Sequence, residues 1–255
     1  MRIVVKVGTS TLAHKTGNLN IRLVRDLCTV LADLKNAGNE VVLVSSGAIG
    51  MGVGKLSLGA RPDDIPGKQA AAAVGQCELM YTYDKLFGEY NHVVGQVLLT
   101  ADDVLNDERF QNFSNTMNRL LEMGALPVIN ENDSISTAEI ALGDNDTLSA
   151  IVAKSVHADM LVILTDCDGL FTADPRTDKD AKLIPLVETI TEDLMQLGGG
   201  SGTKLGTGGM ATKLTAAKMA TGSGIDTIII NGEKPAVLYD IVAGKDFVGT
   251  KFKAQ

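Results

Sequence analysis

The sequence predicts an α/β protein, a three-layer α/β/α sandwich built around a largely parallel open sheet. Short runs of β-branched residues alternate with helical patterns along nearly the whole chain, which is typical of βαβ units. Most of these runs are continuously apolar, as strands buried on both faces are. The chain has 255 residues, of which 45% are hydrophobic, so it can form one large core. We expect a single domain over residues 1–255.

The expected elements alternate between strand and helix. Apolar, β-branched runs predict strands at 2–7, 40–45, 92–99, 126–130, 159–164, 226–230 and 247–252. Apolar residues at helical spacing predict helices between Asn20 and Gly38 and at about 68–88, 112–123, 145–157, 209–221 and 235–243. Asn20 is the expected N-cap of the first of these helices, and Gly38 is expected to end it.

Two glycine-rich segments interrupt this alternation, and both are expected to be loops. The first runs from Gly47 to Gly59, and the second runs from Gly198 to Gly209. The sequence contains no fixed-period repeat and no Ser/Pro-rich linker, so the second loop is the one expected hinge.

Composition excludes several classes of function. The formal net charge of −8 opposes binding to a phosphate backbone, so no nucleic-acid partner is expected. Three widely spaced cysteines suggest neither a disulfide framework nor a zinc site. No apolar run is long enough to cross a bilayer, and the chain opens directly on a strand-like segment, so we expect a cytoplasmic protein with no membrane partner.

Polar residues follow several of the expected strands. Ligands of an open parallel sheet bind beyond the carboxyl ends of its strands, so these residues are the candidates for chemistry. They are Lys6-Val7-Gly8-Thr9-Ser10, Ser45-Ser46-Gly47-Ala48, Asn130-Glu131-Asn132-Asp133 and Thr165-Asp166-Cys167-Asp168-Gly169. Glycine-rich turns before helices, including Gly208-Gly209-Met210, expose backbone N–H groups that suit phosphate or carboxylate. The alternative is that each glycine only permits a tight turn.

Two lysines are candidates for binding phosphate. Lys6 interrupts an apolar strand, so it either reaches the active edge or is an edge-strand lysine in solvent. Lys213 follows Gly208-Gly209 by one helical turn, and its alternative is a solvated helix face. A P-loop is absent from the sequence, and Gly206-x-Gly208-x-x-Ala211 lacks the preceding strand of a dinucleotide fingerprint.

Asp144 and Asp146 offer carboxylates near one helix start. They could be N-caps only, or they could bind a substrate ammonium, orient the lysines or hold Mg²⁺ through water. The three histidines form no evident catalytic arrangement. A carboxylate that accepts a phosphoryl group needs no general base, because it is already ionised at neutral pH, and lysines and backbone amides can stabilise the transferring group.

The ordered motifs resemble the amino acid kinase family over nearly the whole chain and, within it, the glutamate kinases. The matching segments are Lys6-Val7-Gly8-Thr9-Ser10, Ser45-Ser46-Gly47-Ala48, Lys68-Gln69, Ala73-Val74-Gly75-Gln76, 96–100, 127–133, Gly143-Asp144-Asn145-Asp146, 165–166, 169–175 and 206–213. The single Gly8 before Thr9-Ser10 differs from the paired glycines of aspartate and acetylglutamate kinases.

This resemblance implies ATP-dependent phosphorylation of the γ-carboxylate of L-glutamate to L-glutamyl 5-phosphate, the first step of proline biosynthesis. It implies that Lys6 and Lys213 stabilise the transferring phosphoryl group, that Asp146 organises these lysines and that Asp133 binds the α-ammonium. Ser46, Asp133 and Asn145 resemble the glutamate-binding residues. The residues that resemble the ATP site are Lys6, Gly8, Thr165, Asp166, Thr207, Gly208, Gly209, Met210, Ala211, Thr212 and Lys213. ATP is expected as MgATP, with no residue assigned as a metal ligand.

Partners follow from the same resemblance. L-proline is a feedback inhibitor of biosynthetic members, a glutamyl phosphate reductase would consume the product, and a homo-oligomer is expected. Many bacterial members carry a C-terminal PUA domain, and we expect none here because the sequence stops at Gln255. Two alternatives stay open: a kinase of the same fold acting on carbamate, aspartate, N-acetylglutamate or a phosphorylated acceptor, and a catalytically silent amino-acid sensor.

Overall fold

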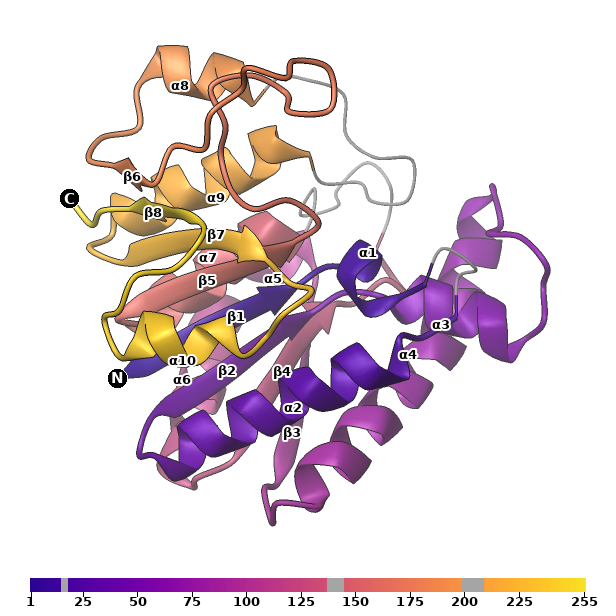
Figure 1. Ribbon diagram of the computed structural model, residues 1–255. Helices are drawn as coiled ribbons and strands as arrows, with labels where there is room; N and C mark the ends of the chain where they lie inside the picture. The colour runs from indigo at the N-terminus through magenta and orange to yellow at the C-terminus, as the bar shows by residue number, and fades with distance from the viewer. Residues whose placement is uncertain (15–17, 137–144, 199–208) are drawn as a thin grey trace.

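The computed structural model describes residues 1–14, 18–136, 145–198 and 209–255 (Figure 1). The strands are β1 (Arg2–Val7), β2 (Glu40–Ser45), β3 (Val94–Leu99), β4 (Leu126–Glu131), β5 (Met160–Thr165), β6 (Leu186–Val187), β7 (Asp226–Asn231) and β8 (Thr250–Phe252). The helices are α1 (Thr9–Leu12), α2 (Ile21–Asn36), α3 (Ala48–Lys55), α4 (Ile65–Gly88), α5 (Ala101–Leu105), α6 (Asp107–Glu122), α7 (Asn145–Ser155), α8 (Glu192–Leu197), α9 (Met210–Thr221) and α10 (Val237–Val242).

The described strands form one open sheet in the order β3-β4-β2-β1-β5-β7-β8-β6. Every neighbouring pair is parallel except β7 and β8, so the predicted α/β class with a largely parallel open sheet is confirmed. In the register of β1, Val7 lies opposite Ser45 of β2 and Leu164 of β5. The carboxyl ends of these three strands therefore lie side by side.

Alternation along β1 divides its side chains between two cores. Ile3, Val5 and Val7 pack in the cluster that contains the buried faces of α2, α4 and α10. Val4 packs in the other cluster, with residues of α6, α7 and α9. Successive strand residues point to opposite faces, so Lys6 lies on the same face as Val4. The position of Lys6 in the alternation thus directs it toward α7 and α9.

The first βαβ unit forms as predicted. The Asn20 side chain accepts a hydrogen bond from the Leu23 backbone N–H at 3.2 Å, which caps α2. Gly38 follows α2 with φ +90°, a conformation that glycine adopts without strain.

The expected loop at 47–59 is wrong, because most of this segment is α3. Its glycines allow α3 to pack closely on α4. A Cβ built on Gly52 would lie 1.8 Å from the Ala71 carbonyl oxygen, and one on Gly75 would lie 1.7 Å from the Ala48 oxygen. The glycine pattern of α3 therefore serves helix packing.

Several boundaries and short elements also differ from the prediction. The helix expected at 112–123 begins five residues earlier, at Asp107, where Asn106 caps it. The strand expected at 247–252 shortens to β8, which pairs antiparallel with β7. The helix α5 was not predicted, because five residues are too few to show a period, although Thr100 and Asp103 form a capping box there.

A membrane-spanning helix is not found within the described ranges, where no helix has both the length and the apolar character needed.

Candidate active site

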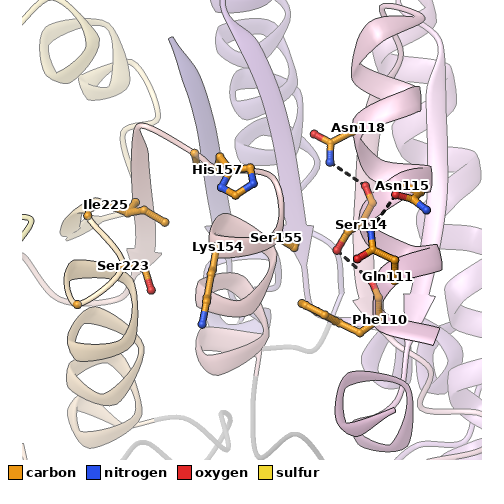
Figure 2. Close-up of a pocket in the computed structure, with 13 residues that line it drawn as sticks. Phe110, Gln111, Ser114, Asn115, Asn118, Lys154, Ser155, His157, Ser223 and Ile225 are labelled. Carbon is orange, nitrogen blue, oxygen red and sulfur yellow. Dashed lines mark hydrogen bonds between the residues drawn. The ribbon is translucent and has the colours of Figure 1, made fainter. Parts of the chain in front are cut away.

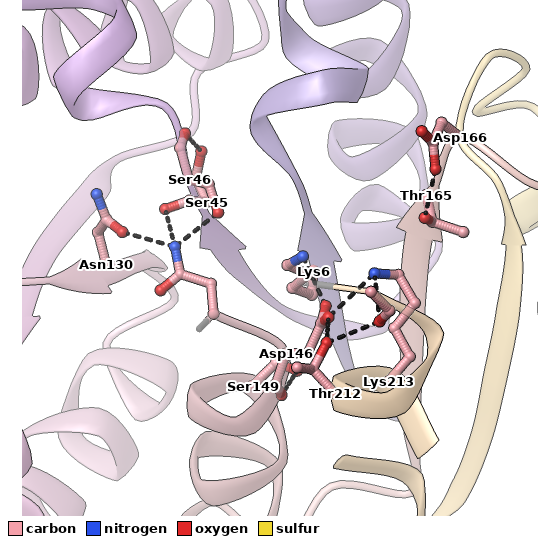
Figure 3. A network of polar contacts seen from close by, with 12 residues as sticks. Lys6, Ser45, Ser46, Asn130, Asp146, Ser149, Thr165, Asp166, Thr212 and Lys213 are labelled. Atoms are coloured by element: carbon pink, nitrogen blue, oxygen red, sulfur yellow. Dashed lines mark hydrogen bonds and ion pairs between the residues drawn. The ribbon is translucent and has the colours of Figure 1, made fainter. Parts of the chain in front are cut away.

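Two buried lysines meet one buried carboxylate beyond the carboxyl end of β1. Lys6 Nζ lies 2.6 Å from Asp146 Oδ1, and Lys213 Nζ lies 3.1 Å from Asp146 Oδ2 (Figure 3). Asp146 lies in the first turn of α7, and Lys213 lies in the first turn of α9. Three elements, β1, α7 and α9, thus bring together three charged residues that are far apart in the sequence.

Burial decides between the alternatives for the two lysines. Both Lys6 and Lys213 are only 6% exposed, and Asp146 is fully buried. β1 lies between β2 and β5 in the middle of the sheet, so Lys6 is no edge-strand lysine in solvent. The alternative of a solvated helix face is likewise wrong for Lys213, and Asp146 does more than begin a helix.

The charges of this trio do not cancel. Burial works to raise the pKa of Asp146, but the ammonium groups of Lys6 and Lys213 outweigh burial and hold that pKa below its usual value. Asp146 is therefore ionised at neutral pH, and the trio carries a net positive charge. A buried positive charge at the ends of parallel strands suits an anionic group such as phosphate.

Two further residues predicted for ATP, Gly8 and Thr212, lie beside this trio. A Cβ on Gly8 would lie 3.4 Å from Lys6 Nζ, so glycine leaves open space beside the ammonium. Thr212 Oγ1 donates to Asp146 Oδ2 at 2.9 Å, and Thr212 lies with Met210 and Ala211 in the first turn of α9, after the N-cap Gly209.

The other ATP candidates lie beside β5 or outside the described residues. Thr165, the last residue of β5, is buried, and its Oγ1 donates to Asp166 Oδ1 at 3.2 Å (Figure 3). Thr207 and Gly208 lie outside the described residues, as do most of the expected second loop and Asp144.

Two of the predicted substrate residues contact one another. Asn145 Nδ2 donates to Ser46 Oγ at 2.6 Å and to the Ser45 carbonyl oxygen at 3.4 Å. Asn145 precedes Asp146 at the start of α7, so this pair adjoins the lysine trio. In Figure 3 the Ser46 group lies on one side of Lys6, and Thr165 lies on the other. The predicted substrate and nucleotide residues therefore flank the trio.

Asp133 follows β4 and is partly buried. Burial and the nearby Glu131 raise its pKa to about 6, although the charge of Arg61 opposes that rise. No hydrogen bond or ion pair in the described part of the chain joins Asp133 to Ser46 or Asn145. The Asp133 carboxylate therefore loses its charge only a little below neutral pH, and a cationic ligand would stabilise its charged form.

A second set of polar residues received no role from the sequence, although Ser45, Gln76 and Asn130 lie in segments named there. Asn130 Nδ2 donates to Gln76 Oε1 at 2.9 Å, and Asn130 Oδ1 accepts from Asn145 Nδ2 at 2.9 Å. Ser45 Oγ and the Tyr83 hydroxyl lie 2.7 Å apart. The signal for Gln76 and Tyr83 is their position on the buried face of α4 with Leu79 and Phe87, where a polar side chain needs a partner.

A cavity of about 790 Å³ lies at the opposite end of α7 and α9 (Figure 2). The α6 side chains Gln111 and Asn115 line one wall, and Lys154, His157 and Ser223 line the rest. Lys154 and Ser223 lie at or just beyond the carboxyl ends of α7 and α9, whereas the trio lies at their amino ends. The cavity is therefore separate from the candidate active site.

Comparison with known proteins identifies the family. The profile described as "Amino acid kinase family" matches residues 1–231. The chain belongs to the amino acid kinase family. A family member named "Glutamate 5-kinase" from Clostridium perfringens is 54% identical over 100% of this chain and 96% of its own length. A protein of the same name from Listeria innocua is 49% identical over 100% of this chain and 93% of its length.

Solved structures support the family fold. A carbamate kinase from Giardia lamblia bound to AMP-PNP superposes with a TM-score of 0.71 at 15% identity, over 99% of this chain and 98% of its own. An isopentenyl phosphate kinase from T. acidophilum gives a TM-score of 0.70 at 19% identity, over 99% and 100%. At these identities the likeness concerns the fold alone.

Proposed function

We propose that this protein transfers the γ-phosphoryl group of ATP to the γ-carboxylate of L-glutamate. The products are L-glutamyl 5-phosphate and ADP, and the reaction begins proline biosynthesis. The observation that carries the proposal is the buried trio, in which Asp146 holds Lys6 and Lys213 together beyond the end of β1. Two fixed ammonium groups with one carboxylate are suited to the charge that develops on a phosphoryl group in transfer.

The chemistry requires no general base. The γ-carboxylate of glutamate has an ordinary pKa of about 4.3, so it is ionised at neutral pH and can attack phosphorus directly. A carboxylate oxygen forms the new bond to the γ-phosphorus while the bond from that phosphorus to the bridging oxygen of ADP breaks. Lys6 and Lys213 would stabilise the transferring group, and Asp146 would position them.

The divalent ion is assigned to the nucleotide. Within the described ranges, no three His, Cys, Asp or Glu side chains are grouped closely enough to hold a metal. Mg²⁺ keeps several waters and takes few carboxylates, and both oxygens of Asp146 already face lysines. Bound with ATP, Mg²⁺ neutralises charge on its phosphates.

The choice of acceptor rests on the sequence relatives. Carbamate kinase and isopentenyl phosphate kinase share this fold, so the fold is compatible with several acceptors. Identity of 54% to a glutamate 5-kinase over the whole chain favours L-glutamate. In this assignment Ser46, Asp133 and Asn145 bind the substrate, with Asp133 facing its α-ammonium.

Hydroxylamine trapping tests the proposal directly. The protein is incubated with MgATP, hydroxylamine and L-glutamate, with L-aspartate and N-acetylglutamate in parallel, and acyl hydroxamate and ADP are measured. Hydroxamate with L-glutamate alone is the expected result. Hydroxamate with another acid would identify a different kinase, and none from folded protein that binds ATP would favour an amino-acid sensor.

Other expectations stay predictions. They are inhibition by L-proline, consumption of the product by a reductase, a homo-oligomer, a cytoplasmic site and a single-domain organisation.

A further inference from the structure

The backbone N–H of Glu131 determines how the side-chain amide of Asn130 is oriented in its hydrogen-bond network. The Glu131 N–H donates to Asn130 Oδ1 at 2.9 Å. A backbone N–H can only donate, so the acceptor must be the oxygen of the Asn130 amide. The nitrogen of that amide then faces Gln76, where Oε1 accepts from it at 2.9 Å. The orientation of the Asn130 amide is therefore fixed.

The orientation of Asn130 also determines which atoms of Gln76 and Asn145 bond to it. Because Gln76 Oε1 accepts from Asn130, the amide Nε2 of Gln76 is left for another partner. Because Asn145 Nδ2 donates to Asn130 Oδ1 at 2.9 Å, the acceptor Asn145 Oδ1 is left. Both Gln76 Nε2 and Asn145 Oδ1 are buried and find no hydrogen-bond partner among the residues the structure describes.

A buried donor and a buried acceptor thus lie on the two sides of Asn130. Gln76 is 8% exposed, and leaving a buried amide unpaired is unfavourable. The network reaches Ser46 through Asn145, at the wall assigned above to the substrate. A free amino acid has the complementary pair of groups, a carboxylate that accepts and an ammonium that donates.

We propose that Gln76 binds the α-carboxylate of the amino-acid substrate through its Nε2 amide. Asn145 Oδ1 is then available to the α-ammonium, with Asp133 as its counter-charge. The inference rests on the proposed function, and it makes Gln76 a residue that selects acceptors with a free α-carboxylate.

Substitution of Gln76 by glutamate tests this role. Gln76→Glu keeps an oxygen for Asn130, removes the Nε2 donor and adds a negative charge. The KM for L-glutamate should rise about 10- to 100-fold, the scale of one hydrogen bond to a charged group. 4-Aminobutyrate retains the ammonium and the reacting carboxylate but has no α-carboxylate. Its Ki as a competitive inhibitor should therefore stay within about twofold or fall.

Both constants are independent of the fraction of folded enzyme, so partial misfolding cannot imitate the result. Gln76→Met is the neutral second variant, with the same contrast expected, and it serves if a buried glutamate prevents folding. Gln111→Glu, the same substitution on the exposed face of α6, is the matched control and should change neither constant.

The outcomes separate the two claims. Equal changes in the KM for L-glutamate and the Ki for 4-aminobutyrate, or no change in either, would overturn the role of Gln76 while the wild type still makes glutamyl hydroxamate. A wild type that makes no hydroxamate from L-glutamate would instead overturn the proposed function.

Discussion

Burying the Asp146 carboxylate costs free energy because the charge loses its hydration, so its presence needs a reason other than stability. A buried ion pair often stabilises a fold no more than apolar side chains of similar volume, because the charges lose their hydration. Here one carboxylate also holds together two ammonium groups that would otherwise repel each other. The arrangement is better explained by the need for a fixed positive site than by stability.

Loss of either lysine should abolish most of the activity. Lys6→Ala and Lys213→Ala should each lower kcat at least about 100-fold, the scale of one electrostatic donor lost at a transition state. Steady-state release of ADP with saturating substrates measures this. Lys218→Ala is the matched control on α9, since its ammonium pairs with Glu192 at the surface. Near-normal kcat in either buried-lysine variant would remove that lysine from the reaction.

Asp133 should introduce an acidic limb into the pH profile. Its pKa is raised to about 6, so the carboxylate loses its charge as the pH falls through that value. The kcat/KM for L-glutamate should therefore fall about tenfold per pH unit below about pH 6, because the α-ammonium loses its counter-charge. Glutamate itself does not titrate there. Initial rates between pH 5 and 8, with excess Mg²⁺, give the profile.

Asp133→Asn supplies the comparison for that profile. This variant should have a raised KM for L-glutamate at pH 7.5 and no limb near pH 6. An unchanged limb in Asp133→Asn would assign the titration to another group and would remove Asp133 from the pocket.

At the scale of elements, the contact between α3 and α4 is the most sensitive to substitution. Gly52→Ala would place a methyl group against the Ala71 carbonyl, so the helices would have to separate. We expect the free energy of unfolding to fall by about 3 kcal/mol or more, at the upper end of overpacking costs. Gly54→Ala, on the same helix with open space around it, should be neutral or stabilising by up to about 1 kcal/mol. Urea denaturation of both variants measures the difference, and equal stabilities would contradict close packing as the reason for Gly52.

Most elements could be predicted from the sequence because their signals are local. The strands show continuous apolar runs, and α2 shows both a period and its caps. The segment that forms α3 could not be predicted in this way. Glycine has a low intrinsic helix propensity, and it is required in this helix only because a neighbouring helix packs very closely against it. That requirement comes from Ala71 and Gly75, which are distant in the sequence.

At the scale of the molecule, the site forms where the strand order reverses. The chain places β2 on one side of β1 and β5 on the other, and ligands of α/β sheets bind at such a point. Strand ends predicted Lys6, Ser46 and Thr165 there. Gln76 and Tyr83 could not be assigned, because their roles depend on the tertiary contacts of α4 with Asn130 and Ser45.

Substrate binding should stabilise the whole fold. L-glutamate at about 100 times its Kd should add about 2.7 kcal/mol to the free energy of unfolding and raise Tm by roughly 5–10 °C for a chain of this size. Thermal unfolding followed by circular dichroism measures the shift. N-acetylglutamate, whose ammonium is blocked, is the control ligand and should give little shift. Equal shifts with both ligands would contradict recognition of a free α-ammonium.

Because side chains alternate between the two faces of β1, the face on which Lys6 lies depends on whether the number of residues before it in the strand is odd or even. Suppose that one residue between Met1 and Lys6 is deleted while the strand keeps its pairing. Val7 would then lie on the face of Asp146, and Lys6 would point toward the apolar side chains of α2 and α4. Removal of two residues would return the lysine to its own side, but two residue positions, roughly 6.6 Å, along the strand. An odd change in this strand therefore turns the lysine to the wrong face, whereas an even change keeps the face but separates the lysine from Asp146.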